Sequence, residues 1–260
     1  MKTTWAYGDY PAMAKALMPA AKTLVDLIEP RAGELVVDLA CGTGNAAILA
    51  AQRGARVIGV DLEPALLEIA ARRAADANLD IHWVEADAGA PGLPRSYFNV
   101  VVSVFGIMYV ADHAQAARSM ARLCRPGGVI GLTTWAPNGF MAALGRTLTP
   151  YLPPPPPGDP PSKWGDKAHV ADLFAAHGLH SVTSVRRTIP LDFEETQQAR
   201  DFFVSTAGHV IAEQPRLEQE KRWNDLLADV SALVRQSNVS PGLDVTINLD
   251  YLLTLVQMPS

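Results

Sequence analysis

Two apolar segments that each end at an aspartate constrain the fold of this chain more than any other feature. The first reaches Asp38 and turns through Gly42 and Gly44; a helical pattern follows, and the second segment closes at Asp61. Glycine is favoured where the backbone takes a positive φ or passes close to a ligand. The N-terminus of the following helix presents unpaired N–H groups. The pattern predicts a βαβ unit that binds a nucleoside, with the second carboxylate placed to accept hydrogen bonds from ribose hydroxyls.

The turn differs from the fingerprint of dinucleotide-binding units. In that fingerprint, G-x-G-x-x-G, three glycines bring a helix N-terminus close to a pyrophosphate. Here Ala47 stands three residues after Gly44, where the third glycine would be. The negative charge of Asp38 beside the turn would repel a pyrophosphate and attract an ammonium group. A ligand with a cationic amino group, a sulfonium and an adenosine therefore fits the turn better than NAD does.

The run Asp38-x-Ala40-x-Gly42-x-Gly44 resembles the first motif of the class I S-adenosylmethionine-dependent methyltransferases, in the form D-x-A-C-G-T-G, where Ala40 replaces the first glycine. Within that family the chain is similar to the small-molecule branch of ubiquinone and menaquinone methyltransferases. The resemblance implies an α/β fold: a Rossmann-like three-layer α/β/α sandwich around a mostly parallel seven-stranded sheet, with a helical cap insertion. It also implies S-adenosyl-L-methionine as the cofactor.

The hydrophobic periodicity divides the chain into three parts. Alternating strand and helix patterns indicate a parallel sheet covered by helices. We expect an N-terminal lid and helix over residues 1–34, a cofactor-binding core over 35–136, and completion of the sheet over 137–260, with cap insertions at about 137–165 and 194–238. The predicted strands are 35–39, 56–60, 81–85, 99–105, 129–135, 181–190 and a strand pair or long strand at 244–256. The predicted helices are 17–28, 45–53, 64–77, 114–123, 139–148, 167–176, 194–207 and 215–234.

The glycine turn is expected to hold the methionine end of the cofactor. The backbone at Ala40, Gly42 and Gly44 leaves room for it, while the side chains of Asp38 and Asn45 can make polar contacts to its amino acid group.

The second and third strand ends are expected to hold the nucleoside. Asp61 offers two acceptor oxygens to two vicinal hydroxyls, although it could instead be the N-cap of a helix opening at Pro64. Leu62 would lie against the adenine ring. The resemblance places adenine recognition at Asp87 and Ala88, and the alternative is that Asp87 is only a loop acid.

Aromatic residues flank this predicted site on two sides. Phe105, at the end of the fourth strand, could cover the sulfonium or belong to the core. Tyr10 belongs to an aromatic N-terminal segment and could lie near the methionine carboxylate or the sulfonium, because an aromatic face attracts cations. A merely docked N-terminus is the alternative.

Candidates for catalysis follow the fourth strand. His113 could remove a proton from an acceptor, with Tyr109 or Asp112 orienting it. The preferred interpretation is structural: Asp112 reads as a helix N-cap and His113 as a first-turn residue. No HxxxH or paired Cys/His spacing supports a metal site.

Composition limits the partners. The net charge of −5 argues against a nucleic-acid binder, and no apolar run is long enough to span a membrane. No signal peptide is evident, so a cytoplasmic location is expected. The later half is rich in apolar side chains, which favours a small hydrophobic acceptor, although these residues could also form the core of the cap or a homodimer interface. They are Phe140, Met141, Leu144, Leu148, Trp164, Phe202, Phe203, Val210, Ile211 and Trp223.

Three alternatives to methyl transfer remain open from the sequence. The fold could use S-adenosylmethionine without transferring its methyl group, in a cyclisation or a decarboxylation. It could be an NAD-dependent oxidoreductase, which the missing third glycine disfavours. The proline-rich tract 152–161 could be a ligand of SH3-type modules, but a stiff surface loop is the favoured interpretation.

Overall fold

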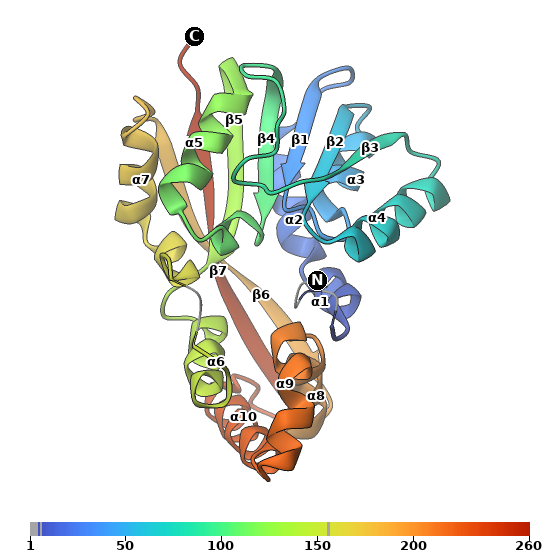
Figure 1. Ribbon diagram of the computed structural model, residues 1–260, viewed down its shortest axis with the longest axis vertical. Coiled ribbons are helices and arrows are strands. Elements are labelled where there is room, and N and C mark those ends of the chain that lie inside the picture. The colour runs from blue at the N-terminus through green and yellow to red at the C-terminus, as the bar shows by residue number, and fades with distance from the viewer. Residues whose placement is uncertain (1–4, 6, 155–156) are drawn as a thin grey trace.

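The computed structural model describes residues 5, 7–154 and 157–260, and it shows a single seven-stranded sheet with the strand order β3-β2-β1-β4-β5-β7-β6 (Figure 1). The five strands β1 to β5 pair in parallel, whereas β7 runs antiparallel to both of its neighbours. The mostly parallel sheet predicted from the sequence is confirmed. The strands are β1 (Leu35–Leu39), β2 (Arg56–Asp61), β3 (Ile81–Glu85), β4 (Phe98–Val104), β5 (Cys124–Trp135), β6 (Val182–Phe193) and β7 (Val245–Gln257).

Helices cover both faces of this sheet, which explains why its central strands are continuous apolar runs. Val101 at the middle of β4 is fully buried, and so is Ile130 in β5. On the two sides, α2 packs against α3 and α5 packs against α7 (Figure 1). The flanking helices are α2 (Met18–Ile28), α3 (Asn45–Gln52), α4 (Pro64–Asp76), α5 (His113–Leu123) and α7 (Lys167–Ala175).

The remaining helices form a cap beyond the carboxyl ends of the parallel strands. The long strands β6 and β7 extend from the sheet into this cap (Figure 1). The cap helices are α6 (Phe140–Leu148), α8 (Thr196–Ser205), α9 (Gly208–Gln219) and α10 (Trp223–Ser237). Phe140 and Phe203 pack with their ring centroids 4.5 Å apart, and both are buried. Half of the ten apolar residues predicted to line the cap are buried in it and form its own core: Phe140, Leu144, Leu148, Phe203 and Val210.

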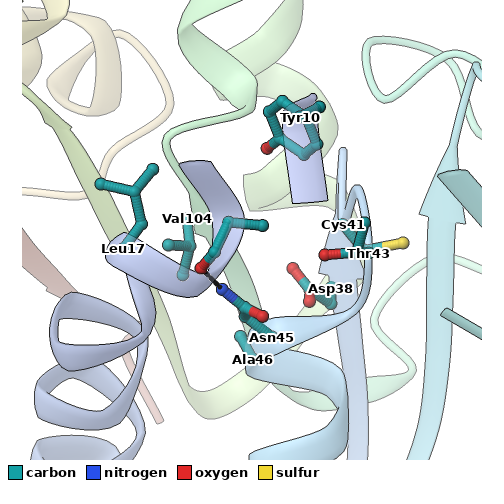
Figure 2. Close-up of a pocket in the computed structure, with 9 residues that line it drawn as sticks. Tyr10, Leu17, Asp38, Cys41, Thr43, Asn45, Ala46 and Val104 are labelled. Carbon is teal, nitrogen blue, oxygen red and sulfur yellow. Dashed lines mark hydrogen bonds between the residues drawn. The ribbon is translucent and has the colours of Figure 1, made fainter. Parts of the chain in front are cut away.

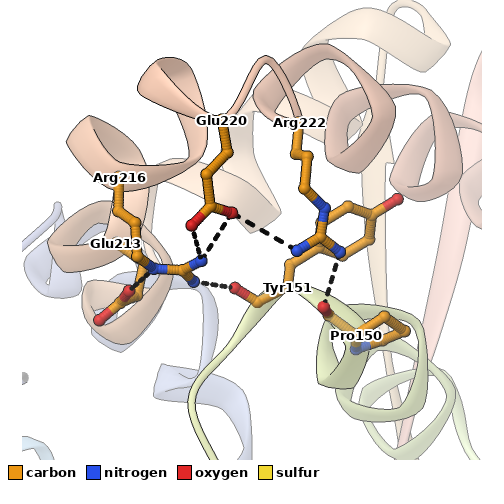
Figure 3. Close-up of polar contacts among 6 residues, drawn as sticks. All are labelled: Pro150, Tyr151, Glu213, Arg216, Glu220 and Arg222. Carbon is orange, nitrogen blue, oxygen red and sulfur yellow. Dashed lines mark hydrogen bonds and ion pairs between the residues drawn. The ribbon is translucent and has the colours of Figure 1, made fainter.

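Polar contacts join the two insertions that make up the cap (Figure 3). Arg216 of α9 pairs with Glu213 and Glu220 and donates to the carbonyl oxygen of Tyr151 at 2.6 Å. Arg222 donates to the carbonyl of Pro150 at 2.8 Å and lies 5.0 Å from the centroid of the Tyr151 ring. The end of the first insertion is therefore held to the turn between α9 and α10.

The helices differ from the predicted pattern in two segments, and β5 begins five residues before the predicted start at residue 129. The prediction of a single helix over 215–234 is wrong. Pro215 lies inside α9, and a separate helix, α10, begins at Trp223 after Lys221 takes a φ of 60°. Proline usually opens a helix, but here the preceding residues already have helical geometry and the left-handed Lys221 supplies the break. At the N-terminus, an additional helix, α1 (Tyr10–Ala16), forms behind the N-cap of Asp9, whose side chain accepts from the Ala12 N–H at 3.1 Å.

The proline-rich tract is held against the loop that precedes α5 (His113–Leu123). Asp159 donates its N–H to the carbonyl oxygen of Ala111 at 3.0 Å, while Pro155 and Pro156 lie outside the described residues. In the part of the chain that the structure describes, no helix is long and apolar enough to cross a membrane.

Candidate functional site

Strained backbone marks the carboxyl ends of the neighbouring strands β1 and β4. Ala40 has a φ of 52° and Phe105 a φ of 55°, a conformation that costs an L-residue about 1–2 kcal/mol. Gly106 permits the two turns to touch, because a β-carbon there would lie 2.5 Å from the Ala40 carbonyl oxygen. Strain of this kind persists only where the surrounding structure imposes it and is concentrated at functional sites.

Glycine is required in the turn for steric reasons as well as for its backbone conformation. Gly42 and Gly44 have φ values of 54° and 81°. A β-carbon at Gly44 would lie 2.7 Å from the ring of Trp83, and one at Gly59 would lie 2.3 Å from the same ring. Trp83, on β3, thus fixes the back of the turn, a role that the sequence pattern did not reveal.

Asp38 lies directly beneath the turn, and its carboxylate has no cationic partner among the described residues. It is 1% exposed, and one oxygen, Oδ2, accepts from the Ala47 N–H at 2.9 Å. Its other oxygen, Oδ1, has no hydrogen-bond partner among the described residues. Burial raises the pKa of Asp38 to about 7; the Ala47 hydrogen bond opposes that rise and Asp61 adds to it. A buried carboxylate of this kind is stabilised by an incoming cation.

Asp61 closes the turn from the neighbouring strand. Its two oxygens accept from the Gly42 N–H at 2.7 Å and the Glu63 N–H at 2.9 Å, and burial raises its pKa. The alternative that Asp61 caps α4 is wrong, because the Glu63 side chain caps that helix through the Ala65 N–H. Each carboxylate oxygen keeps a second lone pair. Contact with a ribose stays a prediction, as does the stacking of adenine on Leu62, which is 56% exposed.

The predicted adenine residues lie at the end of β3. Asp87 is exposed, and its Oδ1 accepts from the Gly89 N–H at 2.8 Å in a local turn. Ala88 is buried, and its carbonyl accepts from Ser119 Oγ at 3.0 Å. Asp87 is held by its loop, as the alternative expected, and adenine recognition stays a prediction.

Tyr10 reaches over the turn from α1 (Figure 2). A β-carbon at Gly42 would lie 3.0 Å from the Tyr10 ring, and burial, helped by the charge of Asp61, raises the pKa of the Tyr10 hydroxyl. Beneath it lies a cavity of about 10 Å³, room for roughly one water molecule. The lining residues are Tyr10, Ala14, Leu17, Asp38, Cys41, Thr43, Asn45, Ala46 and Val104. The N-terminal segment is therefore packed on the turn.

Further aromatic rings surround this position. Trp5 meets Tyr10 and Tyr109 edge-on, with ring centroids 6.0 and 4.8 Å apart. Phe105 is buried and stacks on Trp135 at 3.9 Å. The Phe105 ring is thus part of the core below the site, and its contact with a sulfonium stays a prediction.

The two catalytic candidates lie in different surroundings. Tyr109, in the 3₁₀ helix Ile107–Tyr109, is 44% exposed; burial of its hydroxyl raises its pKa, and a hydrogen bond with Trp135 opposes that rise. His113 is completely buried, with Nδ1 3.1 Å from Nε2 of His169 in α7. Asp112 caps α5 through the Gln115 N–H, which confirms the structural interpretation of that residue. His113 is thus oriented by His169 rather than by Tyr109 or Asp112, and it does not line the cavity of Asp38.

Arg73 of α4 holds the glycine turn from outside, a role that the sequence pattern did not indicate. Its Nη1 donates to the carbonyl and hydroxyl oxygens of Thr43, at 2.5 and 3.0 Å, and to Oδ1 of Asn45 at 2.9 Å. The amide nitrogen of Asn45 donates to the Ala14 carbonyl at 2.6 Å. Both ends of the Asn45 amide are engaged within the protein, and its contact with the cofactor stays a prediction. Among the described residues, no cluster of three or more His, Cys, Asp or Glu side chains could hold a metal ion.

Comparison with known proteins agrees with this geometry. A family model described as a methyltransferase domain matches residues 36–128. An uncharacterised protein of Mycobacterium tuberculosis is 39% identical over 210 residues, which cover 80% of this chain and 76% of the relative. The demethylmenaquinone methyltransferase of Thermus thermophilus is 36% identical over 115 residues, 44% of this chain and 52% of that enzyme. The crystal structure of YcgJ from Bacillus subtilis matches with a TM-score of 0.62 and 17% identity, covering 95% of this chain and 99% of that chain.

The glycine turn lies at the carboxyl edge of a mostly parallel sheet, over a buried carboxylate with one unpartnered oxygen. This arrangement is typical of nucleoside-binding α/β enzymes, and the free oxygen suits a cationic group. The chain belongs to the class I S-adenosylmethionine-dependent methyltransferases, and S-adenosyl-L-methionine is its cofactor. The residues present fit that group, because Oδ1 of Asp38 is a buried acceptor that only a donor from outside the described protein atoms can satisfy.

Proposed function

We propose that the enzyme transfers the methyl group of S-adenosylmethionine to O, N or C of a small, hydrophobic organic acceptor. The observation that carries the acceptor class is the aromatic rim formed by Trp5, Tyr10 and Tyr109 beside the glycine turn. Such a rim suits an apolar or planar molecule. The name of the Thermus relative, a demethylmenaquinone methyltransferase, supports the same class.

The residues at the strand ends would divide the cofactor between them. Asp38 would hold the ammonium group, Asp61 the ribose hydroxyls, Leu62 one face of the adenine, and Asp87 with Ala88 its edge. The bound cofactor supplies a methyl group already activated by the sulfonium. The chain's task is then to align the acceptor with that methyl group and to exclude water, the roles that we assign to Tyr10 and the aromatic rim.

Tyr109 is the better placed of the two catalytic candidates. Its ring is exposed at the rim, and its raised pKa keeps the phenol protonated near neutral pH. It would therefore orient the acceptor as a hydrogen-bond donor rather than act as a base. His113, buried at the start of α5 where it packs against α7, would have a structural role instead.

Methyl-labelled cofactor tests the proposal directly. The enzyme is incubated with the label and a panel of phenols, quinols and amines, with a protein mixture and nucleic acid as separate acceptors. Label in the organic extract, lost when Tyr109 is replaced by alanine, is the expected result. Label recovered only with protein or nucleic acid contradicts the acceptor class. Label retained on the cofactor while the acceptor is converted contradicts methyl transfer and favours a cyclase or decarboxylase.

A further inference from the structure

Arg73 holds the glycine turn from behind, from a helix that contributes nothing to the cavity lining. A single nitrogen, Nη1, serves three oxygen acceptors on Thr43 and Asn45. The side chain is half-buried, and desolvation lowers the pKa of the guanidinium, which stays a cation at neutral pH. Hydrogen bonds from a charged donor are roughly twice as strong as neutral ones.

The guanidinium also decides how the Asn45 amide is oriented. Because Arg73 can only donate, it requires the amide oxygen of Asn45 on its side. The amide nitrogen is thereby turned toward the Ala14 carbonyl of α1, at 2.6 Å (Figure 2). Asn45 is itself buried, so the alternative orientation would leave two donors facing each other without water to relieve them.

Helix α1 depends on such external contacts. It has seven residues, too few for an isolated helix to be stable in water. At its start, Asp9 donates its N–H to the Ser205 carbonyl of the cap at 2.8 Å, and near its end Ala14 receives the Asn45 bond. Between these two contacts α1 carries Tyr10 over Gly42.

We propose that Arg73 is a positioning residue of the cofactor site: by fixing the Asn45 amide it latches α1, and with it Tyr10, over the glycine turn. The cavity under Tyr10 has room for roughly one water molecule, so if the methionine end of the cofactor binds there, α1 has to move outward and return. The latch sets how firmly α1 returns. The latch itself rests on the contacts described above; only its effect on S-adenosylmethionine rests on the proposed function.

Two variants take the latch apart at different bonds. Arg73→Met removes the guanidinium but keeps an unbranched, largely apolar stem, whereas Asn45→Asp keeps an acceptor for Arg73 and loses the donor to Ala14. Arg72→Met is the matched control, because Arg72 is exposed on the same helix and makes no ion pair or hydrogen bond with a described residue. Arg73→Lys, which can donate but lacks the planar fork, is the conservative variant.

Amide hydrogen exchange of the ligand-free protein gives the decisive readout. In Arg73→Met and in Asn45→Asp we expect exchange over residues 12–17 to rise about tenfold or more, the effect of losing one hydrogen bond to a buried group. Exchange in β4 and β5 should stay unchanged, Arg73→Lys should recover part of the protection, and the double variant should add little to either single one. Equal protection of α1 in Arg73→Met and Arg72→Met overturns the latch. A loss of protection spread over the whole sheet overturns it as well, because it would indicate a general structural role.

Calorimetry with S-adenosylhomocysteine separates this inference from the proposed function. We expect about tenfold weaker binding in Arg73→Met and Asn45→Asp and unchanged binding in Arg72→Met. If the wild-type protein does not bind while α1 responds in the exchange experiment, the ligand assignment fails and the latch stands. If the wild-type protein binds and both variants bind equally well, the latch has no role in positioning the cofactor.

Discussion

The glycine turn and the cap differ in how completely their side chains and backbone are stabilised within the protein. Around the turn, Asp38 is buried without a full set of partners and Ala40 and Phe105 are strained. In the cap, aromatic side chains form an ordinary apolar core, and the charged side chains of α9 are paired at the surface. The difference indicates that the turn is shaped for a ligand at some cost in stability, while the cap is shaped for its own stability and supplies a wall.

Replacing Phe203 by alanine should produce the largest effect on folding. The ring is buried among Phe140, Phe193 and Phe202, and truncation of a buried phenylalanine costs about 3–5 kcal/mol of unfolding free energy. Urea unfolding measures this change. Affinity for S-adenosylhomocysteine should stay close to wild type, provided that the variant is assayed below its transition. A tenfold loss of affinity would show that the cap core and the turn are not separate in function.

Replacing Asp38 by asparagine should weaken ligand binding and leave the stability of the fold intact. Removing the charge takes away the proposed charge-assisted contact to the ammonium group, worth about 1.5–3 kcal/mol of binding free energy, or roughly a 10- to 100-fold loss of affinity. The ligand-free protein should be no less stable than wild type, because a buried and partly unsatisfied carboxylate is removed while the acceptor for the Ala47 N–H remains. Calorimetry and thermal unfolding measure the two quantities. A variant that binds normally but unfolds more easily would mean that Asp38 serves the fold and not the ligand.

Stability and ligand affinity should also change in opposite directions with pH. The pKa of Asp38 is raised from 3.8 in the unfolded chain to about 7, so the folded state binds more protons between these values. The contribution of Asp38 to stability is therefore greatest at acid pH and is lost as the pH rises through about 7. A cationic ligand binds the ionised form, so affinity should rise with pH and level off above about 7. Titrations from pH 6 to pH 8 check this, with Asp38→Asn expected to show a flatter profile in both measurements.

The sequence was sufficient for the sheet and for the acids that end its strands, because glycine turns and apolar periodicity are local signals. Contacts between elements were out of reach. Arg73 and Arg72 are neighbours on the polar side of one helical pattern, and only the approach of α4 to the turn distinguishes them. Trp83 could not be matched to Gly44 and Gly59 for the same reason. Pro215 was misleading because its usual place at a helix start is a preference and not a rule.

The smallest effect is expected where this chain departs from the glycine of the family motif. Ala40 has a φ of 52°, and glycine would relieve about 1 kcal/mol of strain there. Glycine also loses more conformational entropy on folding, by about 0.5–1 kcal/mol, so the net change for Ala40→Gly should lie within about 0.5 kcal/mol of zero. Ala40→Val gains no such offset, since a β-branched residue is disfavoured at positive φ, and the turn after β4 already crowds this position through Gly106. Urea unfolding of both variants separates the relief of strain from the loss of entropy. A glycine variant more stable by over 1 kcal/mol would mean that the strain at the turn is greater than its backbone angle indicates. A valine variant as stable as wild type would mean that the turn is not rigid.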